Sequence, residues 1–477
     1  MLPIGKGFVS LLLSYHSQQN NHLAAESMTI KQIEKLKTPK FIQQIESTLK
    51  PLDFLERCAK NYGELFFTNS FGNLETLVVS HPQDLQELFN PKANILAAPG
   101  AANEIFKPQL GENSLIVQDG ERHQKQRKLM MPPFHGEQML NYGQQICEIA
   151  QQVTQHLKPG ETFIARHVSE DITMKIILKV VFGIDEGLRF ENLKKLMTTW
   201  LGLTSSPLSA SVLLFPPLQK DLGAWSPWGR YLRLRQQIDD LLMAEILERR
   251  QQVQSSRCDI LSLLMQAKYE DQEAMSDAEL RDNLLTLLNA GHETTATAIA
   301  WALYWIHQQP EVYEKVLHEL QGLNTPDPMK IAQLPYLTAV CQETLRIYPV
   351  VLFTFPRITL RSVNLRGYHV ASGTYVTPCI YLTHRREDLY PQPVKFQPER
   401  FINRKYSAYE FWPFGGGERQ CLGQVFAMFE MKLILATILL NYQLKLDEKA
   451  PVNPSRRGFL LGPQGGIKMS LIVNTAH

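Results

Sequence analysis

The N-terminal region of this 477-residue sequence has no apolar run long enough to cross a membrane. A spanning helix needs about 20 predominantly apolar residues, but the early apolar run Phe8–Leu13 is short and is broken by Ser10. Residues 14–21 contain no small-residue cleavage site of the kind that ends a signal peptide. We therefore expect neither a transmembrane anchor nor a secretory signal, and Met28 is an alternative start of translation.

The sequence also has few cysteines and a small net charge. The six cysteines are scattered and include no C-x-x-C pair, which argues against a small disulfide-framed secreted domain and favours reduced thiols. The formal net charge is only +2, so composition gives no reason to expect nucleic-acid binding. We expect a monomeric protein that lies in the cytoplasm or peripherally at a membrane surface.

The chain has no internal repeat and no long linker. We expect an irregular N-terminal segment over residues 1–36 and a single domain over residues 37–477. Helical patterns dominate, so the predicted fold class is mainly α with small β-sheets. The main predicted helices cover residues 53–62, most of 121–200, 231–250, 276–309 and 424–440. The predicted strands cover residues 64–68, 76–79, 368–370, 375–380 and 467–473.

One cysteine, Cys421, lies in a glycine-rich turn directly before an apolar helix. The stretch Phe414–Gly423 reads F-G-G-G-E-R-Q-C-L-G. Glycines let the backbone bend tightly and approach a flat ligand closely, and a helix N-terminus lowers a thiol pKa toward the thiolate. Such a thiolate is a credible ligand for haem iron, where it favours O–O cleavage. An isolated cysteine near glycines is more often a buried structural residue. The other residues of the pattern are therefore needed to choose between a haem ligand and a structural cysteine.

The predicted helix 276–309 contains a glycine and polar residues inside an otherwise apolar stretch. Ser276 and Glu279 form a capping box that begins this helix, and its middle is apolar nearly all round. The sequence A-G-H-E-T-T of residues 290–295 stands inside the apolar part. A glycine there lowers helix stability and the polar residues need partners, which is typical of a functional site. Both threonines can instead bond back to carbonyls one turn earlier.

Two charged motifs complete the set. Glu343 and Arg346 form an E-x-x-R pair on one helix face, and Arg400 follows in the stretch P-E-R-F. His123 and Arg127 are four residues apart and share the face of another predicted helix. Taken alone, the first motif is a weak surface ion pair, and the second is a solvated basic helix.

Together these motifs resemble the cytochrome P-450 superfamily of haem-thiolate monooxygenases, from about Lys37 to the C-terminus. The match to the signature F-x-x-G-x-R-x-C-x-G implies that Cys421 is the axial iron ligand. The resemblance implies the cytochrome P-450 fold, in which haem lies between the long central helix and the helix after the Cys loop. The other signature residues implied to bind or cradle the haem are Phe414, Gly417, Arg419 and Gly423.

The resemblance also implies roles on the opposite haem face. Gly291 would leave space for dioxygen, Thr294 would donate a hydrogen bond to the oxygen being activated, and Glu293 would relay protons. Ala290 stands where some fatty-acid hydroxylases carry a glutamate bonded to haem, so we expect non-covalent haem b (heme b) apart from the Cys–Fe bond. The residues implied to hold the haem propionates are His123, Arg127, Arg357 and Arg419. The implied structural network consists of Glu343, Arg346 and Arg400. His292 receives no role.

An apolar substrate and an external electron source follow from the same resemblance. The candidate pocket residues are Ile95, Leu96, Phe106, Leu213, Phe215, Ala290, Val351, Leu352, Phe353 and Phe355. Electrons would come from NAD(P)H through the implied partners, a ferredoxin and a ferredoxin reductase. A basic stretch offers either a contact for an acidic ferredoxin or a solvated face, and it consists of Arg122, Lys125, Arg127 and Lys128.

The implied reaction is insertion of one oxygen atom from dioxygen into an apolar substrate. Similarity to cyanobacterial members favours hydroxylation of long-chain fatty acids, and terpenoids or steroids suit the same lining. A haem-thiolate enzyme that uses no dioxygen, such as a peroxygenase or isomerase, is disfavoured by the pair Glu293 and Thr294. A non-catalytic haem sensor is a remote alternative for the same reason.

Overall fold

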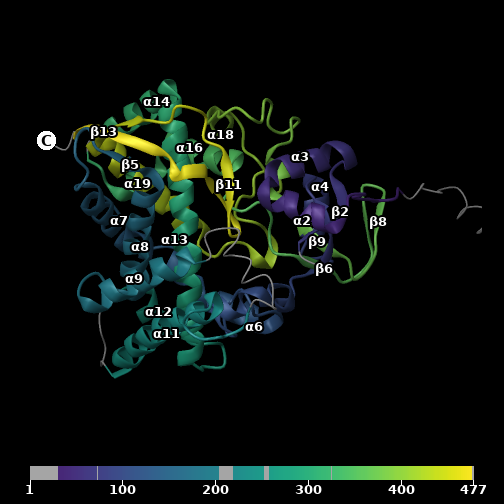
Figure 1. Ribbon diagram of the computed structural model, residues 1–477, viewed down its shortest axis with the longest axis horizontal. Helices are drawn as coiled ribbons and strands as arrows, with labels where there is room; N and C mark the ends of the chain where they lie inside the picture. The colour runs from purple at the N-terminus through teal and green to yellow at the C-terminus, as the bar shows by residue number, and fades with distance from the viewer. Residues whose placement is uncertain (1–30, 72–73, 204–218, 252–256, 324, 475–477) are drawn as a thin grey trace, which may run out of the picture.

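The computed structural model describes residues 31–71, 74–203, 219–251, 257–323 and 325–474. Helices dominate and the sheets are small (Figure 1), which confirms the predicted fold class. The helices of the first half are α2 (Lys40–Leu49), α3 (Pro51–Tyr62), α4 (Pro82–Leu88), α5 (Lys107–Leu110), α6 (Gly120–Met130), α7 (Gln138–Thr154), α8 (Ala165–Phe182), α9 (Leu188–Gly202) and α11 (Pro227–Gln251). Those of the second half are α12 (Ile260–Gln266), α13 (Asp277–Gln308), α14 (Pro310–Gln321), α15 (Pro328–Gln333), α16 (Pro335–Ile347), α17 (Ile380–His384), α18 (Glu399–Asn403) and α19 (Gln424–Asn441).

The strands of the described residues form one larger sheet and several small ones. The six-stranded sheet has the order β1 (Glu34–Lys35), β2 (Leu65–Phe71), β3 (Leu74–Val79), β9 (Tyr375–Pro378), β6 (Arg357–Thr359) and β4 (Leu96–Ala97). The three-stranded sheet has the order β10 (Tyr442–Leu446), β13 (Lys468–Asn474) and β5 (Thr162–Ile164). Two hairpins are formed by β11 (Pro454–Arg457) with β12 (Leu460–Pro463), and by β7 (Val363–Leu365) with β8 (Tyr368–Val370). Short 3₁₀ turns are η1 (Gly100–Phe106), η2 (Pro132–Phe134), η4 (Gly417–Arg419) and η5 (Gln464–Gly466).

Helix α13 is the long central helix of the molecule. Its capping box forms as predicted: Glu279 N donates to Ser276 Oγ at 3.3 Å, and Ser276 N donates to the Glu279 carboxylate at 3.0 Å. Residues 295–304 are buried without a break, because α8, α16 and α19 pack around them. Figure 1 shows α13 running through the helical part of the molecule.

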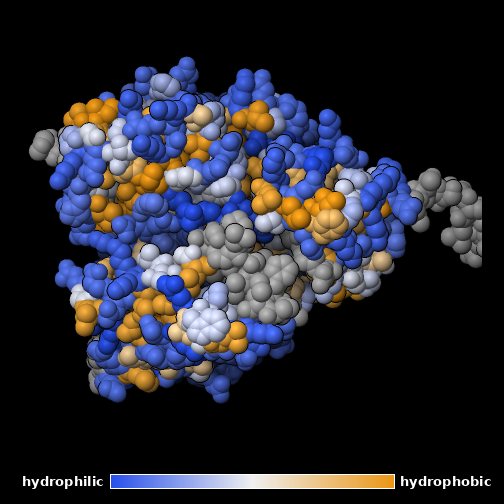
Figure 2. Space-filling model, viewed as in Figure 1, coloured by the Kyte–Doolittle hydropathy of each residue, from blue (hydrophilic) through white to orange (hydrophobic). Residues whose placement is uncertain are grey.

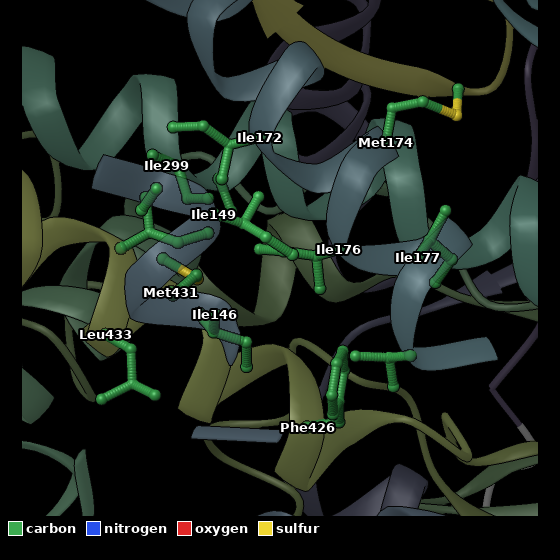
Figure 3. Packing of buried hydrophobic residues seen from close by; sticks show 14 of the residues in the cluster. Ile146, Ile149, Ile172, Met174, Ile176, Ile177, Ile299, Phe426, Met431 and Leu433 are labelled. Carbon is green, nitrogen blue, oxygen red and sulfur yellow. The ribbon is translucent and has the colours of Figure 1, made fainter. Parts of the chain in front are cut away.

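The core next to α13 is built from aliphatic and aromatic side chains of several helices. Figure 3 shows Ile172 of α8 beside Ile299 of α13, with Ile176 of α8 and Met431 of α19 lower in the view and Phe426 of α19 below all four. Helix α19 is long and apolar enough to cross a membrane by length and composition alone. It is a core helix here, because two thirds of its apolar window is buried inside the protein.

Some predicted boundaries differ from the structure. The segment 1–36 was expected to be irregular, but Glu34–Lys35 pairs in parallel with β2. The long helical region 121–200 is four helices interrupted by β5. The predicted strand 375–380 ends at Pro378, because α17 begins at Ile380. Pocket candidates Leu213 and Phe215 lie outside the described residues.

The segment 94–117 contains β4, η1 and α5 and is fastened to α13 at its C-terminal end. Asp282 accepts hydrogen bonds from the backbone N–H of Asn113 at 2.9 Å and from its side-chain amide at 3.0 Å. Leu115 N donates to the Asn283 side chain at 3.0 Å, and Ser114 and Thr286 share a hydrogen bond of 2.7 Å. These contacts fix where the segment crosses the central helix.

Candidate functional site

The turn before α19 holds Cys421 by its backbone. Cys421 N donates to Phe414 O at 2.9 Å, which closes the turn. Gly417 has φ 67°, and a Cβ built there would lie 3.0 Å from the ring of Phe89, so a side chain would strain the turn. At Gly423 a Cβ would meet nothing within 4 Å. The space beside the Cys421 turn is therefore open on the Gly423 side.

The Cys421 side chain is accessible to solvent, yet the surrounding protein raises the pKa of its thiol by desolvation. The Gly423 N–H and the Arg127 charge act in the opposite direction. The expected lowering of the pKa by the helix N-terminus is present in the Gly423 N–H, but the net shift of the Cys421 pKa in the protein alone is upward. The local desolvation outweighs the favourable field of the turn, and a bound cation is what would favour the thiolate.

Four nitrogen-rich side chains gather near this turn. Arg419, Arg127 and Arg357 all lie close enough to lower the pKa of His123, which burial depresses further to about 4. His123 is therefore neutral at pH 7 and offers a ring N–H. Within the described residues, none of the three arginines has a carboxylate within 4.0 Å.

Two of these guanidinium groups contain buried donors without partners. Arg357 is 2% exposed, its Nη1 donates to Phe355 O at 2.7 Å, and its Nη2 has no partner among the described residues. Arg419 Nε is likewise unpartnered in the part of the chain that the structure describes. A buried cation without a counter-charge is costly. The cluster of His123, Arg127, Arg357 and Arg419 therefore fits an anionic group, and a planar pair of carboxylates matches the fork geometry of arginine.

Arg419 also connects the Cys turn to the 94–117 segment. It donates to Leu115 O and to Ala98 O, both at 2.8 Å. Since Leu115 is itself fastened to α13 through Asn283, one arginine links the turn, the segment and the central helix.

Helix α13 has a window of accessible residues between its buried parts. Ala290 is exposed, whereas Leu288 and Thr295 are buried. Thr294 Oγ1 donates to Ala290 O at 2.5 Å, the back-bonding alternative described above. A hydroxyl has one proton to donate. In this conformation the Thr294 hydroxyl proton is used by Ala290 O, and its lone pairs can accept a hydrogen bond from a group placed in the window. Donation to such a group requires the hydroxyl to rotate, and the expected role of Thr294 as donor stays a prediction.

Gly291 serves helix packing. A Cβ built on Gly291 would lie 2.6 Å from Cδ1 of Ile177 on α8. The missing side chain of Gly291 therefore lets α8 and α13 approach closely, and its expected role in leaving space for dioxygen stays a prediction. The accessible position in this turn is Ala290.

Two residues next to this window, Glu293 and His292, have polar partners. Glu293 lies 3.2 Å from Arg166 and 3.8 Å from Arg457. Burial raises the pKa of Glu293, and the two arginines oppose that rise. His292 is buried and hydrogen-bonded to Thr173 at 2.9 Å, and desolvation lowers its pKa to about 4. It lies in the protein interior.

Sequence reasoning missed Glu430 of α19. Its carboxyl is buried, is hydrogen-bonded to the Thr295 hydroxyl, and has a pKa raised well above the usual value by desolvation. The signal was available, because Glu430 is the one acid in the apolar run 424–440. Two acids therefore lie near Thr294. Glu293 precedes it in the chain, and the buried Glu430 is bonded to Thr295, the residue that follows it.

Glu343 of α16 contacts two arginines. Its carboxylate accepts from Arg346 Nε at 2.6 Å and Nη2 at 2.8 Å, and from Arg400 Nε at 3.3 Å. Glu343 and Arg346 are fully buried. Arg346 Nη1 also donates to His384 O and Pro393 O, both at 2.9 Å. The three charges therefore join α16 to the segment before α18.

The pocket candidates do not all line one space. Phe106 packs against Phe355 with ring centroids 5.9 Å apart, and against Phe459 at 4.9 Å. Phe459 was missed, because only the fold brings the β11–β12 turn to η1. Ile95 is 2% exposed inside a core cluster, so its assignment to the pocket is wrong. The remaining described candidates pack partly against core clusters, and they are Leu96, Val351, Leu352 and Phe353.

Comparison with known proteins decides the family. A family model described as Cytochrome P450 matches residues 40–469. The chain belongs to the cytochrome P450 family. This cytochrome P450 is 34% identical over 419 residues to cytochrome P450 135B1 of Mycobacterium tuberculosis, covering 88% of this chain and 86% of that protein. It is 31% identical to cytochrome P450 138 of Mycobacterium bovis, with coverages of 90% and 93%.

A solved structure has the same fold. The structure titled "Retinoic acid bound cyanobacterial CYP120A1" superposes with a TM-score of 0.76 at 27% identity, covering 89% of this chain and 95% of that one. Family membership makes this protein a haem-thiolate monooxygenase. The accessible Cys421, the open side at Gly423 and the partnerless arginine donors fit haem and its two carboxylates.

Proposed function

We propose that this cytochrome P450 hydroxylates long-chain fatty acids, with Cys421 as the thiolate ligand of non-covalent haem b. The observation that carries the site assignment is the cluster of His123, Arg127, Arg357 and Arg419 beside Cys421, with buried donors that no carboxylate of the described residues satisfies. The haem propionates would supply those acceptors. When bound, haem supplies the activation of dioxygen, which thiolate ligation favours.

The window on α13 would handle protons. Thr294 Oγ1 has lone pairs directed away from its bond to Ala290 O, and they hold an O–H donor in place. Glu293 has a pKa raised by burial, so it is a better proton donor near pH 7 than an exposed glutamate. Arg166 keeps Glu293 in position. Proton transfer therefore proceeds from Glu293 through water to the group held by Thr294.

Thr294→Ala is expected to uncouple NADPH use from product formation. Loss of one hydrogen bond, about 1–1.5 kcal/mol, corresponds to roughly a tenfold lower productive rate. NADPH consumption continues, hydrogen peroxide is released, and product per NADPH falls. Thr294→Ser keeps the hydroxyl and is the matched control. Tight coupling in Thr294→Ala would assign the proton path to another group, such as Thr295 with Glu430.

The substrate assignment is supported by the apolar, aromatic contacts of Phe106, Phe355 and Phe459. A retinoid is a second candidate, because the solved structure that matches this chain is titled as retinoic acid bound. Both candidates are long apolar chains that end in a carboxylate, and both suit an apolar lining. Hydroxylation of another terpenoid or of a steroid is the alternative, because these molecules suit the same apolar lining.

A binding screen followed by turnover separates the candidates. We expect saturated fatty acids of increasing length to shift the Soret band of the holoenzyme to shorter wavelength. With NADPH, dioxygen, a ferredoxin and its reductase, mass spectrometry should detect a product heavier by one oxygen atom. Retinoic acid and a steroid are run in parallel. A shift and product with retinoic acid alone would replace the fatty-acid assignment with an isoprenoid one.

A ferredoxin is the proposed electron donor, and the basic residues of α6 support this proposal. Lys128 is paired with Glu270 and Arg122 lies 3.5 Å from Glu279, so both are partly neutralised. Lys125 is exposed and has no ion pair within the described residues. A shallow groove beside this helix is lined by Gln124, Arg127, Lys128, Met131, Pro132 and His135. These features support a contact with an acidic partner on the Arg127 side of α6.

A further inference from the structure

Helix α2 is an amphipathic helix with its polar face turned inward. Gln43 and Ser47 are only 1% and 8% exposed. Phe41, Ile45 and Leu49, which follow each other at four-residue spacing, are 63%, 54% and 70% exposed. Residues four apart share a helix face, so these three side chains form one continuous apolar strip. Figure 2 shows hydrophobic residues gathered on the face of the molecule where α2 lies in Figure 1.

The inward polar face is fixed by specific hydrogen bonds. Gln43 donates to Thr38 O at 2.7 Å. The side-chain oxygen of Gln43 accepts from Thr68 Oγ1 at 3.0 Å and from Asn69 N at 2.8 Å. Rotating α2 to bury its apolar strip would leave these polar groups unpaired, which is unfavourable. The orientation of the strip is therefore determined by the fold.

Positive charge surrounds the strip. Lys37 and Lys40 precede it, Lys50 follows it, and all three are exposed without an ion pair in the described part of the chain. Glu46, the one acid on α2, is paired with Arg57. Residues 31–60 contain seven basic and four acidic residues, whereas the whole chain has a net charge of only +2. Cationic groups at both ends of an apolar strip suit an interface that is apolar inside and anionic at its surface.

We propose that α2 docks this cytochrome P450 on a phospholipid bilayer with anionic headgroups, with Phe41, Ile45 and Leu49 inserted among the acyl chains. Lys37, Lys40 and Lys50 would lie at the level of the phosphates, where long side chains extend their charges to the interface. A protein partner is less suitable, because three side chains cover much less than the roughly 800 Å² per partner of a stable interface.

The docked orientation has a consequence for substrate entry, which rests on the proposed function. Arg456 of β11 donates to Ser47 O of α2 at 3.2 Å. The turn of the same hairpin carries Phe459, which is 39% exposed and packs on Phe106. Docking through α2 would therefore bring this aromatic contact close to the bilayer, the phase in which a long apolar substrate is dissolved.

Vesicle flotation of the full-length holoenzyme tests the docking. The vesicles are phosphatidylcholine with or without about a third of phosphatidylglycerol. We expect the wild type to bind the anionic vesicles in a salt-sensitive manner. The combined variant Phe41→Gln, Ile45→Gln, Leu49→Gln should bind at least tenfold more weakly. A matched variant at three other exposed apolar positions, Leu188→Gln, Leu222→Gln, Val394→Gln, should bind as the wild type does.

A charge variant and a stability check complete the design. Lys37→Gln, Lys40→Gln, Lys50→Gln should weaken binding to anionic vesicles and reduce its salt dependence. Thermal unfolding and the CO difference spectrum should be unchanged in all variants, so a loss of binding is not a loss of fold or haem. Residues 1–30 are the same in every protein. Wild-type binding by the α2 variant would overturn the proposal, as would a wild-type dimer that this variant dissociates.

Discussion

Glu343→Ala is expected to give protein that unfolds at a much lower temperature and retains little haem. Glu343 and Arg346 are fully buried, and the Glu343 carboxylate is the one acidic partner of both Arg346 and Arg400 among the described residues. Its removal leaves buried guanidinium charges uncompensated, which costs about 3–5 kcal/mol. Thermal unfolding and haem content of the purified variant measure the effect.

An exposed pair provides the control for this prediction. Glu399 pairs with Lys315 at 2.7 Å, and its side chain is 42% exposed. Surface pairs of this kind contribute about 0–1 kcal/mol, so Glu399→Ala should unfold close to the wild type. Soluble Glu343→Ala holoenzyme with wild-type stability would show that the three residues do not stabilise the fold.

Cys421→Ala is expected to abolish the red-shifted CO band that thiolate ligation produces in the reduced protein. The reason is that the other cysteines lie in other parts of the fold, and Cys421 is the one on the turn before α19. Cys58→Ala, Cys147→Ala and Cys258→Ala should keep the band. Cys421→His should also lose it while offering a different ligand, because imidazole does not supply the electron density of a thiolate.

The haem content of the Cys421 variants separates ligation from cofactor binding. If Cys421→His contains haem with an altered spectrum, the cluster of His123, Arg127, Arg357 and Arg419 is sufficient to hold the propionates. An unchanged CO band in Cys421→Ala would require another axial ligand and would remove the basis of the site assignment.

Features set by local signals were predictable from the sequence. The start of α13 follows from the Ser276–Glu279 capping box, and its end from Pro310. The start of α19 follows from the glycine-rich turn before an apolar run. The E-x-x-R pair forms because residues three apart share a helix face. In each case the decisive residues are neighbours in sequence.

Features set by tertiary contacts were not predictable. The packing role of Gly291 was not predicted, because sequence alone does not show that Ile177 of α8 lies 2.6 Å from its absent Cβ. The direction of the Thr294 hydroxyl depends on its conformer. Ile95 proved to be a core residue and Phe459 was missed, because burial and the approach of the β11–β12 turn to η1 are properties of the whole fold.

Helix α2 illustrates a third case. Its apolar residues repeat with helical spacing, but a repeat does not state which face meets the protein. The inward face is chosen by Gln43, whose partners Thr68 and Asn69 lie on β2. The usual rule that the apolar face is buried would have oriented this helix the wrong way round.

The two ends of the 94–117 segment are held differently, so they should differ in thermal motion. Residues 113–115 are bonded to Asp282, Asn283 and Thr286 of α13, so their amides should exchange with solvent only when that end of the segment detaches from the helix. The η1 turn is held to the β11–β12 turn through ring contacts of Phe106, which break one at a time at small cost. The η1 turn is also held by Gly100 N, which donates to Asp119 at 3.0 Å, and by the Asn103 side chain, which donates to Ile116 O at 3.0 Å. The contact between η1 and the β11–β12 turn should therefore open most readily, while the arginine that links Ala98, Leu115 and the cysteine turn stays in place.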